Sequence, residues 1–252
     1  MKCTCYDPAA VQTKICRSFL PGQGPSMTTS HLQTVIAIFV RHPVPGRVKT
    51  RLARALGDGA ACDFYRAMVA DCIATVRASG LPLFLFHDGL DAAGLPPEWT
   101  GAAAAVVSQE GDSLGERMGA AFERSFAAGA EGVILAGSDI PGIDVELLQS
   151  ALESIEHQDA AIAPALDGGY CLVASRRGRF NSGIFRGIPW STPRVLDMSV
   201  AACRAHGVSY RLLEPRQDID TMDDLTAYCL KPSASAPMTN AWLVTQGFLA
   251  HL

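Results

Sequence analysis

The sequence predicts an α/β fold of three layers, in which a mainly parallel sheet lies between two layers of helices. Two observations predict it. Short apolar runs alternate with segments of helical periodicity, and polar residues gather directly after the apolar runs. The chain has 252 residues, of which 48 % are hydrophobic, and this is enough for a substantial core. We expect one domain over residues 32–230, an N-terminal extension over 1–31 and a C-terminal tail over 231–252.

The apolar runs that predict strands are short and are bounded by turn-forming residues. They span residues 33–40, 82–87, 104–108, 132–137, 159–164, 170–174 and 208–213. Helical periodicity fills three of the gaps, over about 60–79, 114–128 and 144–155. In the first of these helices Tyr65, Met68 and Cys72 share one face. Such alternation favours a parallel sheet, whose ligands bind beyond the carboxyl ends of the strands.

Charge and cysteine content narrow the class of protein. The formal net charge of −4 argues against a general nucleic-acid binder, whose footprint would be basic. The eight cysteines are scattered without a disulfide pattern, as in reducing compartments. Since no apolar run reaches the length of a membrane span, we expect a cytoplasmic protein. Apolar groups around Trp242 and Phe248 are candidates for docking on the domain or on a partner, such as a second copy in a homodimer.

A basic, turn-rich loop follows the first apolar run. It carries Arg41, Gly46, Arg47, Lys49 and Arg51. The cations can neutralise a diphosphate, and Gly46 lets the backbone approach it closely. The alternative interpretation is a solvated basic turn before a helix. Neither a P-loop nor a dinucleotide fingerprint is present in the sequence.

Two acidic segments are candidates for a metal site. Asp139 follows the run 132–137, where a carboxylate is well placed to hold Mg²⁺ or Mn²⁺. Its alternative role is to cap a helix, for which Asp144 is better placed. Near the end of the domain, the spacing of Thr221 and Asp224 predicts a capping box. That box leaves Asp218 and Asp220 unexplained, and one of them is the second candidate ligand.

The turn Asp167-Gly168-Gly169, followed by Tyr170, joins two apolar runs. Its composition predicts a plain hairpin. Paired glycines also let a sugar or a base lie against the backbone, with Asp167 accepting hydrogen bonds from hydroxyl groups. Both interpretations stand at this point.

Six ordered motifs resemble those of the DUF2064 group of GT-A-like bacterial glycosyltransferases, some of which are associated with arsenosugar biosynthesis. The motifs are the run Phe39 to Leu56, Leu114 to Met118, Gly137 to Pro141, Asp167 to Tyr170, Ile188 to Pro193 and Asp218 to Thr221. They cover about residues 34–230. The resemblance implies a three-layer, Rossmann-like GT-A fold of the nucleotide-diphospho-sugar transferase type, with the donor over the carboxyl ends of the strands.

The resemblance also implies roles for particular residues. The donor diphosphate would be held by Arg41, Arg47, Lys49 and Arg51. Asp139 would stand where GT-A enzymes carry the metal-binding Asp-x-Asp. Because Ser138 precedes it in place of a second carboxylate, Asp220 is expected to supply the other ligand. Trp190 would be a stacking platform for a sugar beside Gly168, Gly169 and Tyr170, or else a core residue.

The expected reaction is transfer of a sugar from a nucleotide-diphospho-sugar donor to a small acceptor, with Mg²⁺ or Mn²⁺ as cofactor. Asp167 is the candidate base for the acceptor hydroxyl, and Arg117 is a second catalytic candidate. The alternative is a nucleotidylyltransferase, similar to guanylyltransferases on the same fold, which would release pyrophosphate. A non-catalytic module that binds nucleotides or sugars is the third hypothesis.

Overall fold

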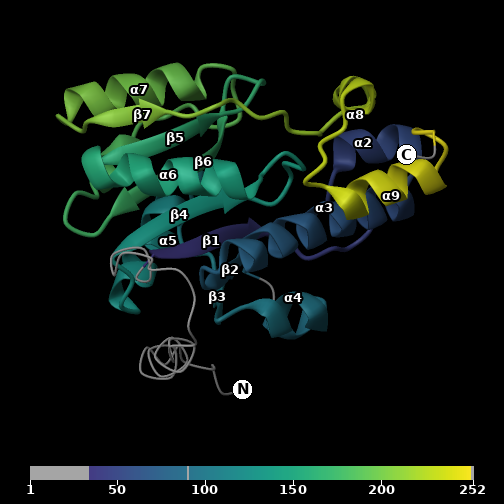
Figure 1. Ribbon diagram of the computed structural model, residues 1–252, viewed down its shortest axis with the longest axis horizontal. Helices are drawn as coiled ribbons and strands as arrows, with labels where there is room; N and C mark the ends of the chain where they lie inside the picture. The colour runs from purple at the N-terminus through teal and green to yellow at the C-terminus, as the bar shows by residue number, and fades with distance from the viewer. Residues whose placement is uncertain (1–33, 90, 251–252) are drawn as a thin grey trace.

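The computed structural model describes residues 34–89 and 91–250, so the expected extension over 1–31 lies outside the described residues (Figure 1). A seven-stranded sheet forms the centre, in the order β3-β2-β1-β4-β6-β5-β7. The strands are β1 (Thr34–Val40), β2 (Leu83–His87), β3 (Ala105–Ser108), β4 (Gly132–Gly137), β5 (Ala160–Pro164), β6 (Tyr170–Arg176) and β7 (Tyr210–Leu212). Each predicted apolar run coincides with one of them, with β6 extending two residues beyond the run 170–174, which confirms the predicted fold class.

One strand of the sheet runs against its neighbours. β1, β2, β3 and β4 are parallel to one another, and β7 is parallel to β5. β6 is antiparallel to both β4 and β5, which confirms the predicted hairpin at Asp167-Gly168-Gly169. Ala136, near the end of β4, lies opposite Leu172. The start of β6 therefore lies at the sheet edge where β1 and β4 end.

Helices cover both faces of the sheet, and alternate side chains of β1 serve the two cores. Ile36 and Ile38 pack with α3 (Asp58–Ser79) and α6 (Val145–His157), whereas Val35 and Ala37 pack with α5 (Leu114–Ala127). Burial on both faces explains why the strands read as continuous apolar runs. The other helices are α2 (Thr50–Leu56), α4 (Pro97–Ala102), α7 (Val195–Ala205), α8 (Met222–Leu230) and α9 (Pro237–Thr245), with 3₁₀ turns η2 (Ala92–Gly94) and η3 (Ser182–Phe185).

Residues of the expected C-terminal tail form α9, which lies along α3 (Figure 1). Asp71 on α3 is only 2 % exposed, and its two oxygens accept hydrogen bonds from the backbone N–H groups of Met238 and Thr239. These are donors of the first turn of α9, which the helix itself leaves unpaired. The Trp242 ring packs on Phe64 at 4.9 Å between centroids. A buried carboxylate and an aromatic contact therefore fix α9 to the domain.

The described cysteines Cys62, Cys72, Cys171, Cys203 and Cys229 are free thiols. Within residues 34–89 and 91–250, no helix has the length and apolar character needed to cross a membrane.

Candidate functional site

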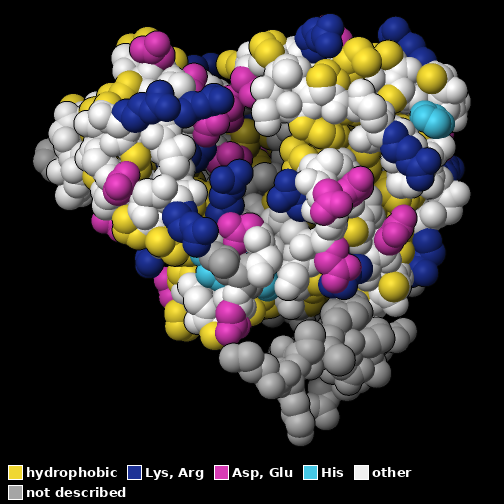
Figure 2. Space-filling view, turned by 180° about the vertical axis from the view of Figure 1, so that it is seen from behind, with side chains coloured by type: hydrophobic (Ala, Val, Ile, Leu, Met, Phe, Trp, Pro, Cys, Tyr) yellow, Lys and Arg dark blue, Asp and Glu magenta, His cyan; other side chains and the backbone are white. Residues whose placement is uncertain are grey.

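A cavity of about 750 Å³ lies beyond the carboxyl ends of β1 and β4. In Figure 2 this face is hollowed, with Lys, Arg, Asp and Glu side chains gathered around the hollow. Seven residues predicted as site residues line the cavity: Arg41, Lys49, Arg51, Arg117, Asp139, Tyr170 and Asp220. The antiparallel β6 contributes Tyr170 and Cys171, since its first residues lie beside the end of β4. The sheet thus collects residues from distant parts of the sequence at one edge.

Lys49 joins two carboxylates at this edge. Its ammonium donates a hydrogen bond to Asp220 Oδ1 at 2.7 Å and contacts Asp139 Oδ2 at 3.5 Å. The Lys49 side chain is 4 % exposed, whereas those of Asp139 and Asp220 are 47 % and 41 % exposed. The sequence predicted that Lys49 holds a diphosphate. In the structure its partners are the two candidate metal ligands.

The charge of Lys49 affects the neighbouring carboxyl group. Burial acts to raise the pKa of Asp220, but the charge and hydrogen bond of Lys49 outweigh it, with help from Arg51 and Arg41. The pKa of Asp220 therefore lies below its ordinary value. Asp220 is held as a carboxylate, the form that a cation binds.

Lys49 has an unusual backbone conformation. It precedes α2 in the left-handed region, at a φ of 47°. This region costs a residue other than glycine about 1–2 kcal/mol. Among the described residues, Ser191 is the other non-glycine residue at positive φ, and it also lines the cavity. Strained backbone concentrates at functional sites, where the surrounding structure maintains it.

The other predicted residues of the basic loop lie outside the cavity wall. Gly46 has a φ of 78°, and a Cβ there would lie 3.3 Å from Asp58 Oδ2. The turn and the approach to Asp58 account for this glycine. Arg47 is exposed, and its N–H donates to the Val44 carbonyl within the same turn. Of the predicted cations, Arg41, Lys49 and Arg51 face the cavity.

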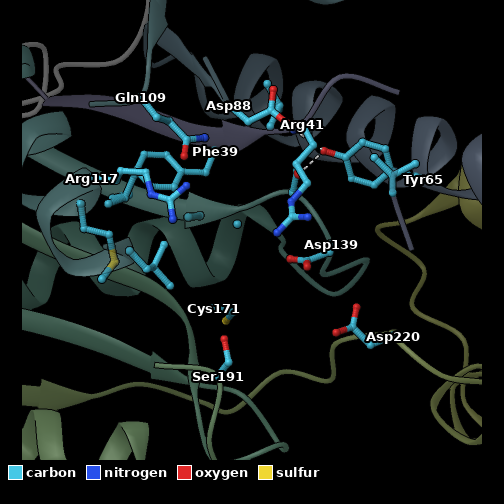
Figure 3. A pocket seen from close by; sticks show the side chains of 18 of the residues that line it. Phe39, Arg41, Tyr65, Asp88, Gln109, Arg117, Asp139, Cys171, Ser191 and Asp220 are labelled. Atoms are coloured by element: carbon cyan, nitrogen blue, oxygen red, sulfur yellow. Dashed lines mark hydrogen bonds between the residues drawn. The ribbon is translucent and has the colours of Figure 1, made fainter. Parts of the chain in front are cut away.

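Tyr65, which the sequence predicted as a core residue of α3, ties the basic loop to the end of β4. Its hydroxyl accepts a hydrogen bond from the Arg41 N–H at 2.8 Å and lies 3.0 Å from Ser138 Oγ. Figure 3 shows Tyr65 beside Arg41 on the wall of the cavity, with Asp139 across from the guanidinium group. Burial raises the pKa of Tyr65, so the phenol stays protonated. The apolar periodicity of the predicted helix over about 60–79 gave no sign that Tyr65 has this polar role.

The predicted sugar-binding turn packs on the chain. Gly168 has a φ of 90°, and a Cβ there would lie 2.3 Å from the Pro193 carbonyl oxygen. The Gly168 carbonyl accepts a hydrogen bond from the Leu196 N–H. Asp167 is exposed and accepts a hydrogen bond from the Gly169 N–H at 2.8 Å. These contacts explain the residues of the turn by packing and hydrogen bonding within the chain. Asp167, Gly168 and Gly169 lie outside the cavity wall.

Asp218 lies close enough to sense the charge of Asp167. Partial burial and then the Asp167 carboxylate raise the pKa of Asp218 to about 6. Further along the segment Ile219 is fully buried, and Asp220 contacts Lys49. Of the two acidic candidates in this segment, Asp220 is the one that lines the cavity.

Tyr170 lines the cavity on the side of α5, and Trp190 packs against Tyr170 outside the cavity wall. Their rings meet edge to face with centroids 6.1 Å apart, and the Tyr170 hydroxyl lies 3.8 Å from Met118 Sδ. A Cβ on Gly115 would lie 3.1 Å from the Trp190 indole, so this glycine leaves room for the ring. Trp190 thus packs behind Tyr170 and against the hydrophobic core. Arg117, on α5, lines the same side of the cavity.

Two polar cavity residues that directly follow strands, Asp88 and Gln109, were not predicted as site residues. Asp88 follows β2 and lies 2.9 Å from Nδ1 of the buried His42, whose Nε2 donates to the Asp91 carbonyl at 2.7 Å. Gln109 follows β3 and donates from its amide to the Phe86 carbonyl at 2.9 Å. Both are labelled in Figure 3, near Phe39. The rule that ligands bind beyond the carboxyl ends of strands would have found them.

The donor set of the cavity suits a divalent cation that a substrate helps to hold. Mg²⁺ prefers oxygen ligands and is usually bound by one or two carboxylates together with substrate phosphates. Asp139 and Asp220 provide two such carboxylates around one point. Within the described chain there is no group of three or more His, Cys, Asp or Glu side chains arranged around a metal position. The remaining ligands would therefore come from a phosphate and from water.

Known proteins share the sequence pattern and the architecture of this chain. The DUF2064 family, described as uncharacterized protein conserved in bacteria, matches residues 68–192. A solved structure from Desulfovibrio desulfuricans G20, provisionally named a nucleotide-diphospho-sugar transferase, is 32 % identical with a TM-score of 0.74, covering 87 % of this chain and 99 % of that one. The chain belongs to the DUF2064 family. Lys49 and Asp220 lie outside the segment that the family description matches.

A second solved structure shows how widely the fold of this DUF2064 protein occurs. It is the 4-diphosphocytidyl-2C-methyl-D-erythritol synthase of Anaerococcus prevotii DSM 20548, at 9 % identity and a TM-score of 0.50, covering 79 % of this chain and 100 % of that one. At this identity the likeness concerns the fold alone. No curated protein matches the chain. The fold is thus shared with a protein named as a nucleotide-diphospho-sugar transferase and with one named as a diphosphocytidyl-methylerythritol synthase.

Proposed function

We propose that this DUF2064 protein is a glycosyltransferase that moves a sugar from a nucleotide-diphospho-sugar to a small acceptor, assisted by a divalent cation. One observation carries the proposal. The cavity brings the cations Arg41 and Arg51 together with the carboxylates Asp139 and Asp220. Cationic and acidic groups at one point suit a ligand that arrives as a diphosphate with its metal.

Each group has a task in the proposed reaction. When the bond between the sugar and the diphosphate breaks, negative charge develops on the departing diphosphate. Arg41 and Arg51 offer guanidinium groups that can pair with phosphate oxygens in bidentate fashion. Asp139 and Asp220 would hold Mg²⁺ or Mn²⁺, which supplies further positive charge to the leaving group when bound. Asp167 as the acceptor base stays a prediction, since its carboxylate lies on the exposed turn beside this cavity.

The name of the Desulfovibrio relative supports sugar transfer for this chain, because it is 32 % identical over nearly its whole length. The rival is nucleotidyl transfer, in which the same cations would face a nucleoside triphosphate. The two reactions differ in their products. A glycosyltransferase releases a nucleoside diphosphate from a nucleotide-sugar, whereas a nucleotidylyltransferase releases pyrophosphate from a nucleoside triphosphate.

The first experiment measures thermal stabilisation by nucleotide-sugars and nucleoside triphosphates, each with and without Mg²⁺ or Mn²⁺. A ligand at one hundred times its Kd stabilises the folded state by about 2.7 kcal/mol. Ligands that stabilise are then assayed for released nucleoside diphosphate and pyrophosphate. Release of nucleoside diphosphate in the presence of an acceptor supports the proposal. Pyrophosphate from a triphosphate identifies the rival, and binding without turnover across all donors identifies a binding module.

The second experiment tests the two carboxylates. Asp139→Asn and Asp220→Asn should each lower turnover at least about a hundredfold, as expected when a group that stabilises transition-state charge is lost. Asp223→Asn is the matched control, since Asp223 is an exposed carboxylate near Asp220 in sequence. Turnover of Asp139→Asn equal to that of the control would remove the metal site from the proposal.

A further inference from the structure

The position of Lys49 raises a question about the metal site on which the proposed function depends. One ammonium contacts both carboxylates, at 2.7 Å from Asp220 and 3.5 Å from Asp139. A divalent cation that binds the same carboxylates would meet a like charge within contact distance. Since like charges repel strongly at such separations, the ammonium and the metal cannot share the two carboxylates at low cost.

Burial shows that the Lys49 ammonium lies on the protein side of the two carboxylates. The Lys49 side chain is almost fully covered, whereas about half of each carboxylate side chain faces solvent. Each carboxylate also has a second oxygen, Asp139 Oδ1 and Asp220 Oδ2, that has no hydrogen bond to Lys49. An incoming cation can therefore reach both carboxylates from the cavity before the ammonium leaves.

Without Lys49 the two carboxylates would repel each other. The ammonium supplies one positive charge against their two negative charges, so these three groups together keep an excess of one negative charge, while Arg41 and Arg51 act on Asp220 from the cavity wall. That excess still attracts a divalent cation. The cation would neutralise the charges of both carboxylates, so Lys49 would no longer be needed as their counter-ion.

From these contacts we infer that Lys49 is a displaceable counter-ion. It holds Asp139 and Asp220 together while the metal is absent, and it moves into the cavity when a divalent cation binds them. The freed ammonium then faces the donor diphosphate, the ligand predicted for it from the sequence. This inference rests on the metal site of the proposed function. It adds a second position for Lys49 and an order of events.

Because the chain has only four lysines, the accessibility of Lys49 can be measured separately from that of the others. The lysines of the whole sequence are Lys2, Lys14, Lys49 and Lys231. Lys49 is buried between carboxylates, and Lys231 is exposed after α8. An amine-acylating reagent at fixed pH, followed by peptide mass spectrometry, reports the accessibility of each lysine separately. Lys231 is the internal reference in the same sample.

The experiment compares acylation rates in the full chain with no metal, with Mn²⁺, and with Mn²⁺ plus a nucleoside diphosphate. Binding of Mn²⁺ is followed in parallel by its paramagnetic signal, which needs no turnover. We expect Mn²⁺ to increase acylation of Lys49 at least tenfold relative to Lys231, and the nucleoside diphosphate to reduce it again. In Asp220→Asn, Lys49 should be acylated rapidly even without metal, because it has lost its shortest contact.

A variant tests the competition directly. Lys49→Met keeps most of the side-chain length and removes the charge, so it should bind Mn²⁺ alone about tenfold more tightly than the wild type. It should bind the nucleoside diphosphate in the presence of Mn²⁺ more weakly. These opposite changes distinguish displacement from a general loss of structure, which would weaken both.

The outcomes separate the inference from the proposed function. If Mn²⁺ binds but leaves Lys49 as protected as before, Lys49 is a fixed structural residue and the inference is wrong, while the metal site stands. If Mn²⁺ binds neither the wild type nor Lys49→Met, both the metal site and the inference are wrong. Turnover of a nucleotide-sugar is measured independently of both results.

Discussion

The hydroxyl of Tyr65 accepts a hydrogen bond from the backbone N–H of Arg41 at 2.8 Å. The same oxygen lies 3.0 Å from Ser138 Oγ. A single phenol thus joins the residue that begins the basic loop to the residue that precedes Asp139. The position of the cations relative to the carboxylates depends on this contact.

Replacing Tyr65 by Phe should weaken binding of the donor about tenfold, or about 1.4 kcal/mol, because the basic loop loses its fixed position. Stability should also fall, by about 1–3 kcal/mol, since the Arg41 N–H is left without its acceptor. Donor affinity can be measured by calorimetry and stability by chemical denaturation.

Tyr228→Phe is the matched control for this change. The Tyr228 hydroxyl likewise accepts a backbone N–H, from Ser233, and donates to Asn240 Oδ1, but it lies beside α9. It should lose similar stability and keep its affinity for the donor. Equal loss of donor affinity in both variants would show that Tyr65 acts through overall stability alone.

His87 should make the stability of the protein depend on pH. It is 3 % exposed, and Nδ1 has no hydrogen-bond partner among the described residues. Burial, and then the nearby His42, lower the pKa of His87 below its ordinary value of 6.5, against the opposing charges of Asp88 and Asp91. The unfolded chain therefore binds this proton more tightly than the folded chain. The contribution to stability is complete above pH 6.5 and is lost as the pH falls below it.

Melting temperatures between pH 7.5 and 5.5 test this expectation. The wild type should lose up to about 1.4 kcal/mol per pH unit in this range from His87 alone. His87→Leu, which removes this buried imidazole, should lose less. His157→Gln changes an exposed histidine at the end of α6 and should follow the wild type. A pH slope in His87→Leu as steep as that of the wild type would contradict the assignment.

Gly168 should tolerate a methyl group poorly. Alanine there would meet both a φ of 90° and a carbonyl oxygen 2.3 Å from its Cβ. Gly187 separates these effects, because it has a φ of 69° and nothing within 4 Å of the Cβ position. Gly187→Ala should cost about 1–2 kcal/mol for its backbone conformation. Gly168→Ala should cost more and should shift the fluorescence of Trp190, because the segment around Pro193 must move. Equal losses in both variants would show that the turn adapts freely.

The strands were predicted because burial on both faces gives each of them an uninterrupted apolar run. The helix α7 was not predicted. Its buried residues are Val195, Ser199 and Cys203, while Met198 is 39 % exposed. A serine in the buried stripe and an apolar residue outside it conceal the helical period. In α4, which has six residues, Trp99 alone is buried, and a single residue shows no period.

The site residues that directly follow a strand in the sequence were predictable. Asp139 lies directly after a buried strand, and the basic loop lies after another. The pairing of Lys49 with Asp220 could not be predicted, because it depends on how two distant segments meet in space. The role of Tyr65 was missed for a similar reason. It comes from hydrogen bonds across the fold, which leave no sequence pattern.

The contact between Lys49 and Asp220 joins residues 171 positions apart, and the cap that Asp71 provides for α9 spans 167 and 168 positions. Both connect the first third of the chain to its last part. During synthesis, the basic loop and α3 emerge from the ribosome well before their acidic and helical partners. A growing chain that has just reached Asp139 already carries the basic loop, yet it lacks Asp220. The proposed metal site therefore gains its second carboxylate only when the chain has been extended as far as Asp220.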